Sequence, residues 1–476
     1  MLPIEQGPEW CQNGATFLKA AGAEGCKFIQ EPGLAVSSYI MSPADRIAHI
    51  RQSFPEEGMF RDKEWVLSPE AFALDAATVA LIEKLGPALR AFQRACNRLY
   101  FESLEKPEIA WVAQLMDQGK PAHVIALGRE ARWRNDLPGV LRPDLVLTED
   151  GVCISELDSL PGGIGLTGWL NETYAALGQP VLGGGAGMVE GFAAAFPNED
   201  ILISRESGDY QPEMEWLMGK LNERGGGFPR SVMNPWNLTP RELAGSSVYR
   251  FFELFDLDNV DLATEMLKMA QEGELQFSPP LKAFLEEKLW LVLFWSPPLQ
   301  DYWREALGQA DYELLQKCIP QGWVVDPAPL PPFAVYPGLN IQSWQEAKKF
   351  GGKQRELVLK ISGFSEVGWG SRSVSIGHDL SQEQWAAALD EALASFPTNP
   401  FVMQRFQRAR VVNHPAWNEE RQETAMMKSR VRLCPYYFVP QGTEETRLGG
   451  VLATVCPADK KILHGMRDAM MLPCVG

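Results

Sequence analysis

The sequence predicts a protein of mixed α+β and α/β architecture, and three features indicate this class. Two strand-like segments flank a turn at 149–151, a lysine-bearing strand–loop–strand pattern spans 356–376, and strand and helix patterns alternate over 200–236. Apolar runs bounded by Gly, Pro, Asn or Asp are typical of strands, whereas apolar residues spaced about three to four apart are typical of helices.

Length, composition and charge limit the class of protein. The chain has 476 residues, 45% hydrophobic and 22% charged, which is typical of a globular protein and not of a disordered one. At about 150 residues per domain, this length corresponds to roughly three domains. The net charge of −17 argues against nucleic-acid and membrane-surface partners, because both require a basic face. A nucleotide site needs only a local cluster of cations and is not excluded.

Cysteine usage and the N-terminus predict a cytoplasmic protein with reduced thiols. The eight cysteines form no Cys-x-x-Cys pair, and unpaired thiols are favoured over a bridge between Cys11 and Cys26. The N-terminus lacks the basic and apolar regions of a signal peptide. The longest strongly apolar run, 289–295, is too short to span a bilayer.

The order of predicted elements follows from the apolar pattern. A core helix is expected near 77–104, a strand at 123–127 and a hairpin over 143–158. Residues 261–317 are predicted to be mainly helical, and a Pro-rich linker to follow at 326–340. A helix N-capped by Ser381 and strands at 401–407, 429–439 and 448–456 complete the chain. The predicted parts are 1–120, 121–198, 199–260, 261–340 and 341–476.

The predicted hairpin carries the first candidate site. Folding back at the turn places Asp144 level with Glu156, and Asp158 shares the strand face of Glu156. Three converging carboxylates are costly to bury without a cation, and oxygen ligands favour Mg²⁺ over Zn²⁺. Arg142, on the strand face of Asp144, is a candidate for a phosphate oxygen beside the metal. A solvated acidic edge with one salt bridge is an equally good interpretation.

The segment 357–374 carries the second candidate site, a phosphate-covering loop. Lys360 ends an apolar strand and precedes a Gly- and Ser-rich loop, whose backbone N–H groups could bind phosphate oxygens. The order of lysine and glycines fits neither a P-loop nor a dinucleotide fingerprint, and an ordinary Gly-rich hairpin is the alternative. The candidate loop residues are Gly363, Ser365, Gly368, Gly370 and Ser371.

Two later strands supply weaker candidates. The strand at 401–407 could offer backbone groups to an adenine edge with Gln404 nearby, although a core strand is the simpler interpretation. Arg430 and Arg432 share one strand face and are either a phosphate clamp or exposed edge charges. The sequence contains no Gly-x-Ser-x-Gly nucleophile elbow, and no spacing of its histidines indicates a triad or a zinc site.

Taken together, these blocks resemble the circularly permuted ATP-grasp proteins of the glutathionylspermidine-synthase type. The matching motifs are Arg142-x-Asp144, an Asp-Gly turn, Glu156-x-Asp158 followed by Pro-Gly, and then the lysine strand with its Gly-rich loop. The carboxylate block precedes the lysine block, as in the permuted group.

A third block and two departures complete the resemblance. The stretch at 284–295 is similar to the Asn-Lys helix block of the family, which assigns Lys288 to the nucleotide. Asp158 stands where the family usually has Asn, and Glu287 stands where Asn is expected before the lysine. The clear resemblance covers about 140–165 and 355–410, well under half of the chain.

The resemblance implies an ATP-grasp fold with a pre-ATP-grasp-like α/β unit at 199–260, and an ATP- and Mg²⁺-dependent carboxylate–amine ligase that works through an acylphosphate. The carboxylate would come from a small molecule or a peptide. A nucleotide-binding protein of this fold without ligase activity stays an alternative. A phosphotransferase on a related fold is another, with His464 as the candidate phospho-acceptor. The implied roles are Arg142 for the phosphoryl group, Lys288, Lys360, Gln404 and Arg432 for ATP, and Asp144, Glu156 and Asp158 for Mg²⁺.

Overall fold

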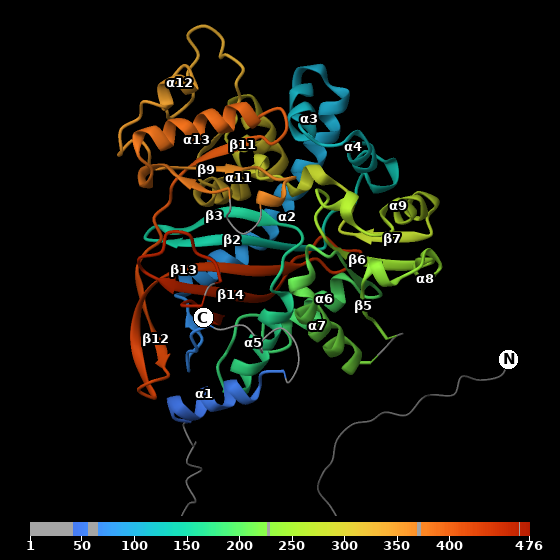
Figure 1. Ribbon diagram of the computed structural model, residues 1–476, viewed down its shortest axis with the longest axis vertical. Helices are drawn as coiled ribbons and strands as arrows, with labels where there is room; N and C mark the ends of the chain where they lie inside the picture. The colour runs from blue at the N-terminus through green and yellow to red at the C-terminus, as the bar shows by residue number, and fades with distance from the viewer. Residues whose placement is uncertain (1–40, 56–64, 226–228, 369–372, 466) are drawn as a thin grey trace, which may run out of the picture. The chain divides into compact units, whose positions relative to one another are not determined.

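Three β-sheets organise residues 42–476, which form one compact unit (Figure 1). This computed structural model describes residues 41–55, 65–225, 229–368, 373–465 and 467–476. Cys11 and Cys26 lie outside these residues, and the other six cysteines are buried free thiols. Within the described residues, no helix has the length and apolar character needed to cross a membrane. The proposed division into five parts stays a prediction.

The largest sheet has seven strands and combines the predicted hairpin with the C-terminal strands. Its order is β1-β15-β14-β13-β2-β3, with β12 paired to β13. All neighbours are antiparallel except β1 and β15. The strands are β1 (Phe72–Ala73), β2 (Val140–Thr148), β3 (Gly151–Asp158), β12 (Val412–Asn418), β13 (Glu423–Phe438), β14 (Arg447–Pro457) and β15 (Met470–Val475).

The hairpin of β2 and β3 has the register that the sequence predicts. Asp144 is paired with Glu156, and Arg142 with Asp158. The turn ends at Gly151, whose φ of 128° is a backbone conformation that side chains with a Cβ rarely adopt. The predicted convergence of these charged residues on one strand face is therefore set by the backbone.

The second sheet carries the predicted lysine strand. It has the order β10-β9-β11-β8 with antiparallel pairing throughout. One face packs on α13, whose N-cap Ser381 accepts a hydrogen bond from the Gln384 N–H, as expected of a capped helix. The elements are β8 (Gly322–Val324), β9 (Leu357–Ile361), β10 (Ser375–Ile376), β11 (Phe401–Arg405), α12 (Trp344–Ala347) and α13 (Gln382–Ser395).

The third sheet forms a parallel α/β unit with the order β5-β4-β6-β7. Helical crossovers connect its strands, as parallel pairing requires. Glu213 of this unit accepts hydrogen bonds from the N–H groups of Gly163 (2.7 Å) and Leu166 (3.0 Å) at the start of α5 (Ile164–Ala176). These bonds tie the unit to a helix that packs on β14 and β15 of the large sheet. The elements are β4 (Asp200–Ile203), β5 (Val232–Met233), β6 (Ser246–Phe251), β7 (Leu275–Ser278), α6 (Gly187–Ala195), α7 (Gln211–Glu223), α8 (Pro240–Leu243) and α9 (Ala263–Glu272).

The remaining helices pack on the three sheets and on one another. The predicted helix near 77–104 is α2, which packs against α11 and α3 through buried apolar side chains such as Leu89 and Phe92. Burial of this helix supplies a large part of the core. The helices are α1 (Pro43–Gln52), α2 (Ala76–Glu105), α3 (Ala110–Asp117), α4 (Ala122–Gly128), α5 (Ile164–Ala176), α10 (Leu289–Leu293) and α11 (Gln300–Cys318).

The predicted strand at 123–127 is wrong, because this segment forms α4. Val124 and Leu127 are buried, whereas His123 is exposed. A spacing of three places the two apolar residues on one helix face, where they join the core cluster that includes Leu281. The apolar run was too short for its period to separate helix from strand.

Candidate active site

A cavity of about 920 Å³ lies where the hairpin face meets the second sheet and the α/β unit. Basic residues outnumber acidic ones among the described residues that line it, although the whole chain carries a charge of −17. Such a local surplus of cations favours anionic ligands. The charged lining residues are Arg142, Lys288, Lys360, Arg405, Arg408, Arg430, Arg432, Lys461 and Arg467, with Asp144, Glu156, Asp158 and Glu253.

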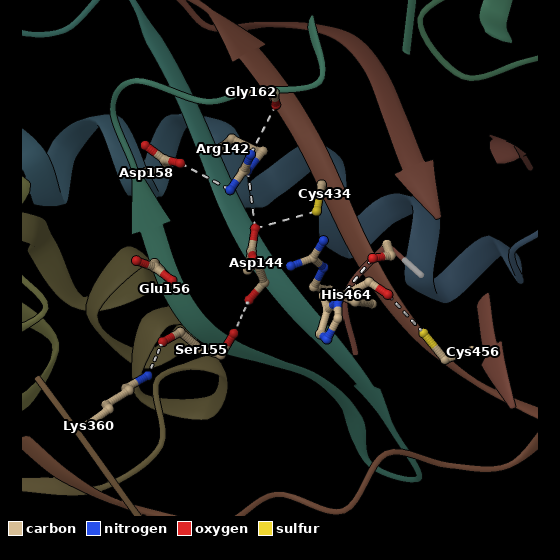
Figure 2. A network of polar contacts seen from close by, with 12 residues as sticks. Arg142, Asp144, Ser155, Glu156, Asp158, Gly162, Lys360, Cys434, Cys456 and His464 are labelled. Carbon is tan, nitrogen blue, oxygen red and sulfur yellow. Dashed lines mark hydrogen bonds and ion pairs between the residues drawn. The ribbon is translucent and has the colours of Figure 1, made fainter. Parts of the chain in front are cut away.

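Arg142 lies at the centre of a buried ion-pair cluster on the hairpin (Figure 2). Its Nε is 3.1 Å from Asp144 Oδ1, and its Nη2 is 3.0 Å from Asp158 Oδ2. Its Nη1 donates to the Gly162 carbonyl at 3.0 Å. Arg432 Nη1 from β13 donates to the other oxygen of Asp144 at 2.9 Å. The two arginines thus take up part of the negative charge of the hairpin.

The two aspartates of this cluster have opposite pKa shifts. Burial alone would raise the pKa of Asp144, but the Arg142 and Arg432 guanidinium groups outweigh it and lower that pKa. For Asp158, burial outweighs Arg142, and nearby Glu156 adds repulsion, so its pKa is raised. Asp144 is therefore the more firmly ionised of the two.

Two lysines from different parts of the chain reach the β3 edge of the hairpin. Lys288 Nζ is 2.5 Å from Glu156 Oε1. Lys360 Nζ donates to the Ser155 carbonyl at 2.5 Å, as Figure 2 shows. Burial lowers the pKa of Lys360 to about 8, with a contribution from Lys288. Burial also opposes the charge of Lys288, but Glu156 outweighs it and raises the pKa of that lysine.

The segment around Lys288 is less helical than the sequence predicts. Helix α10 spans only Leu289–Leu293, and Lys288 is its N-cap residue. Glu287 is extended, with φ −108° and ψ 130°. Its side chain is buried in an ion pair with Lys120, a contact between distant segments that local periodicity does not reveal.

The predicted phosphate-covering loop is described in part. Gly368 lines the cavity, whereas Gly370 and Ser371 lie outside the described residues. A Cβ on Gly363 would lie 2.6 Å from the Glu286 carbonyl, so close packing requires glycine there. Ser365 accepts a backbone hydrogen bond from Gly368 at 2.9 Å; neither Gly363 nor Ser365 is among the described lining residues.

Gln404 on β11 lines the cavity with an unsatisfied amide. The residue is 3% exposed, and its buried Nε2 has no hydrogen-bond acceptor among the described residues. An unpaired buried donor costs about 1–3 kcal/mol, which an acceptor on a ligand would recover. The role of Gln404 as an adenine contact stays a prediction, and the pattern of its strand had little specificity.

Comparison with known proteins matches the fold but no sequence family. No protein-family profile and no curated protein match the chain. A glutathione synthetase-like effector from Globodera pallida, in its apo form, aligns with 91% of this chain and 97% of its own. The TM-score is 0.51 and the identity 12%. The chain shares the fold of this glutathione synthetase-like protein. A putative γ-glutamylcysteine synthetase from Methylobacillus flagellatus covers 73% of this chain and 81% of its own, with a TM-score of 0.34 and 11% identity.

The glutathione synthetase-like fold confirms the predicted mixed α/β class at the level of the fold. Its match extends over 91% of the chain, much further than the motifs at 140–165 and 355–410. The circular permutation, the nucleotide and the metal are not tested by this match. They stay predictions that rest on the residues of the cavity.

The carboxylates of the hairpin are the type of donor that Mg²⁺ prefers, but they do not form a complete metal site by themselves. Among the described residues, no three His, Cys, Asp or Glu side chains group closely enough to hold a metal ion. Arg142, Arg432 and Lys288 partly neutralise the hairpin instead. Mg²⁺ commonly binds through one or two carboxylates and completes its shell with substrate phosphates and waters. The oxygen donors fit an ion that arrives with a nucleotide.

Several lining residues were missed in the sequence. Cys434 and Tyr436 follow Arg432 at intervals of two along β13, so strand periodicity could have found them. Tyr436 donates its hydroxyl to the Gly162 carbonyl at 2.8 Å. Lys461 was also missed. It lies between β14 and β15 with His464, the predicted phospho-acceptor of the alternative function, and no local pattern indicates that this connection returns to the hairpin.

Proposed function

We propose that the protein is an ATP- and Mg²⁺-dependent ligase that joins a carboxylate to an amine through an acylphosphate. The observation that carries this proposal is the convergence of two lysines on adjacent residues of β3 in one cavity: Lys288 pairs with Glu156, and Lys360 donates to the Ser155 carbonyl. The two lysines and the carboxylates of the hairpin all belong to the motifs that resemble the ATP-grasp group. The shared fold of a glutathione synthetase-like protein supports it.

The nucleotide would lie between the hairpin and the second sheet. Lys288 and Lys360 would neutralise phosphate charge, and the N–H groups of the loop that contains Gly368 would add donors. Gln404 Nε2, buried without an acceptor, would donate to the adenine edge. Arg432, already paired with Asp144, would contribute positive potential near the phosphates.

Glu156 and Asp158 would hold Mg²⁺ together with phosphate oxygens, and Asp144 would complete the acidic face. Bound Mg²⁺ supplies neutralisation of the phosphate charge. The present ion pairs of Glu156 with Lys288 and of Asp158 with Arg142 would then loosen. Each released cation would be close to the phosphates.

The reaction has two steps that balance. A carboxylate oxygen of the substrate attacks the γ-phosphorus, the bond to the β-phosphate oxygen breaks, and ADP leaves. The amine then attacks the acyl carbon, inorganic phosphate leaves, and the nitrogen loses a proton to form the amide. Arg142, with its planar set of N–H donors, would stabilise the charge on the transferring phosphoryl group.

The substrates would bind beside Arg142, at the side of the cavity formed by the α/β unit. Tyr210, Phe251 and Glu253 of this unit line the cavity, together with Trp65. Aromatic surface next to a carboxylate and an arginine suits a small molecule or peptide that carries both apolar and charged groups.

Mg-ATP, with mixed pools of carboxylates and amines, is expected to give ADP release that depends on both pools. With hydroxylamine in place of the amine pool, an acylphosphate would be trapped as a hydroxamate, which mass spectrometry detects. Glu156→Ala should reduce both signals by about 100-fold or more, because it removes a proposed metal ligand. ADP release without hydroxamate or amide under any pool would contradict the ligase.

Triphosphate binding is expected to take up a proton above pH 8. In the free protein, the pKa of Lys360 is about 8, so this lysine is mostly neutral at about pH 9. Phosphate charge favours the ammonium form, so affinity for Mg-ATP should fall as the pH rises through 8. Calorimetry in two buffers of different ionisation heat measures the uptake. Lys360→Arg, which stays charged, should abolish it; unchanged uptake in that variant would assign the proton elsewhere.

A phosphotransferase is the second candidate, and the position of His464 favours it. His464 lines the same cavity, and its Nδ1 is 3.0 Å from the Gly465 carbonyl. That contact would fix the ring with Nε2 available as the phosphate acceptor. Labelled ATP would then give an acid-labile phosphoprotein that His464→Asn abolishes.

Binding of Mg-ATP without any turnover would indicate the other alternative, a nucleotide-binding protein without ligase activity.

A further inference from the structure

A buried ion pair involves the residue that precedes Lys288 in the chain. Glu287, at the position where the resembled family has Asn, pairs with Lys120, and both side chains are 2% exposed. Lys120 also donates to the Met116 carbonyl at 2.6 Å. The negative charge that Glu287 adds at this position is therefore balanced by Lys120, a lysine from a distant part of the chain. Neither side chain lines the large cavity.

Ser362 connects this ion pair to both lysines of the proposed nucleotide site. Its hydroxyl donates to the second oxygen of Glu287 and accepts from the Leu289 N–H at 2.9 Å. Its carbonyl accepts from the Lys288 N–H at 3.1 Å. Ser362 follows Lys360 by two residues at the end of β9. One fully buried serine thus joins the segment of Lys288 to the strand of Lys360.

The start of the Gly-rich loop is packed on the same cluster. A Cβ on Gly363 would lie 3.1 Å from Glu287 Oε2. Phe364 has a φ of +44°, a left-handed backbone conformation that is strained for a residue with a side chain. Its ring lies 5.5 Å from Lys120 Nζ. The direction in which the loop leaves β9 is therefore fixed by contacts with Glu287 and Lys120.

We infer that Glu287 is a positioning residue that acts through Ser362. It sets the distance between Lys288 and Lys360, and it sets the direction in which the phosphate-covering loop leaves β9. The inference rests on the proposed nucleotide site. A role in stability alone does not account for the arrangement, because buried ion pairs are often no more stabilising than apolar residues of similar volume. Here the second oxygen of the Glu287 carboxylate accepts the hydrogen bond from Ser362, the residue that joins the segments of Lys288 and Lys360.

The test uses the full chain and two double variants that separate charge from the hydrogen bond. K120M/E287L removes both charges and the acceptor for Ser362, whereas K120M/E287Q removes both charges and keeps an acceptor. R98M/E102Q, at an exposed ion pair on α2 outside the cavity, is the matched control. The measurements are the thermal midpoint, the Kd for Mg-ATP, and hydrogen exchange of the Lys288 and Leu289 amides.

K120M/E287L is expected to bind Mg-ATP about tenfold more weakly, with faster exchange of both amides, because the hydrogen bond to Ser362 is lost. K120M/E287Q should stay within about twofold of the parent in both readouts. Parental Kd and parental exchange in K120M/E287L would overturn the inference. If that variant does not fold, Ser362→Ala gives the same comparison with the ion pair intact, and parental values there would also overturn it.

The two proposals fail in different ways. If the parent chain does not bind Mg-ATP, the nucleotide site is wrong, and amide exchange without nucleotide still decides the positioning role. In that case, faster amide exchange in K120M/E287L but not in K120M/E287Q would support the link through Ser362. Equal exchange in the two double variants would overturn it. If the parent binds and the exchange is unchanged, only the positioning role is wrong.

Discussion

Lys360→Ala is expected to abolish the protection that Mg-ATP gives the protein against thermal unfolding. A ligand at about 100 times its Kd stabilises the folded state by about 2.7 kcal/mol. The variant should lose nearly all of this, because a buried ammonium at the phosphates is replaced by a methyl group. Removing a buried lysine whose pKa is already lowered should leave the unliganded midpoint close to that of the parent.

The exposed Lys349, between α12 and β9 and outside the described cavity lining, provides the control. Lys349→Ala should keep the full shift of the thermal midpoint with Mg-ATP. Unchanged protection in Lys360→Ala would show that the Gly-rich segment is an ordinary hairpin and that phosphate binds elsewhere.

Arg142→Lys is expected to lower turnover by about 100-fold or more while Mg-ATP affinity stays within about threefold. Lysine keeps the positive charge but cannot reproduce the three contacts of Arg142 with Asp144, Asp158 and Gly162. Loss of one donor to developing charge typically costs 100- to 1,000-fold in rate, by order of magnitude. Steady-state ADP release measures the effect, with the carboxylate that the assay of mixed pools identifies as the substrate.

The conservative change at Arg98, an exposed residue of α2 paired with Glu102, controls for general effects of Arg-to-Lys replacement. Arg98→Lys should have parental turnover. Turnover of Arg142→Lys within about threefold of the parent would mean that Arg142 only braces the hairpin through its ion pairs.

Most of the hairpin was predictable because its information is local. One turn and the period of two along each strand bring Asp144 close to Glu156. The β-bulge between Asp144 and Leu145, which pairs these two carboxylates, is not specified by the turn. The strand of Lys360 and the helix capped by Ser381 were found for the same reason.

The rest of the site depends on contacts between distant segments, which a single sequence does not specify. Arg432 reaches Asp144 across 288 positions of the chain, and Lys120 reaches Glu287 across 167. The expectation that a metal must neutralise the hairpin did not include the ion pairs of Lys288 and Arg432 with its carboxylates. The error at 123–127 is different, since there local pattern favoured a strand and tertiary packing selected a helix.

The most direct test is a crystal structure of the chain with Mg-ADP. The phosphates are expected between Lys288 and Lys360, the adenine beside Gln404, and the metal between phosphate oxygens and the carboxylates of Glu156 and Asp158. Nucleotide bound away from the hairpin, or at the hairpin without contact to Lys360, would contradict the assignment of this cavity as an ATP site.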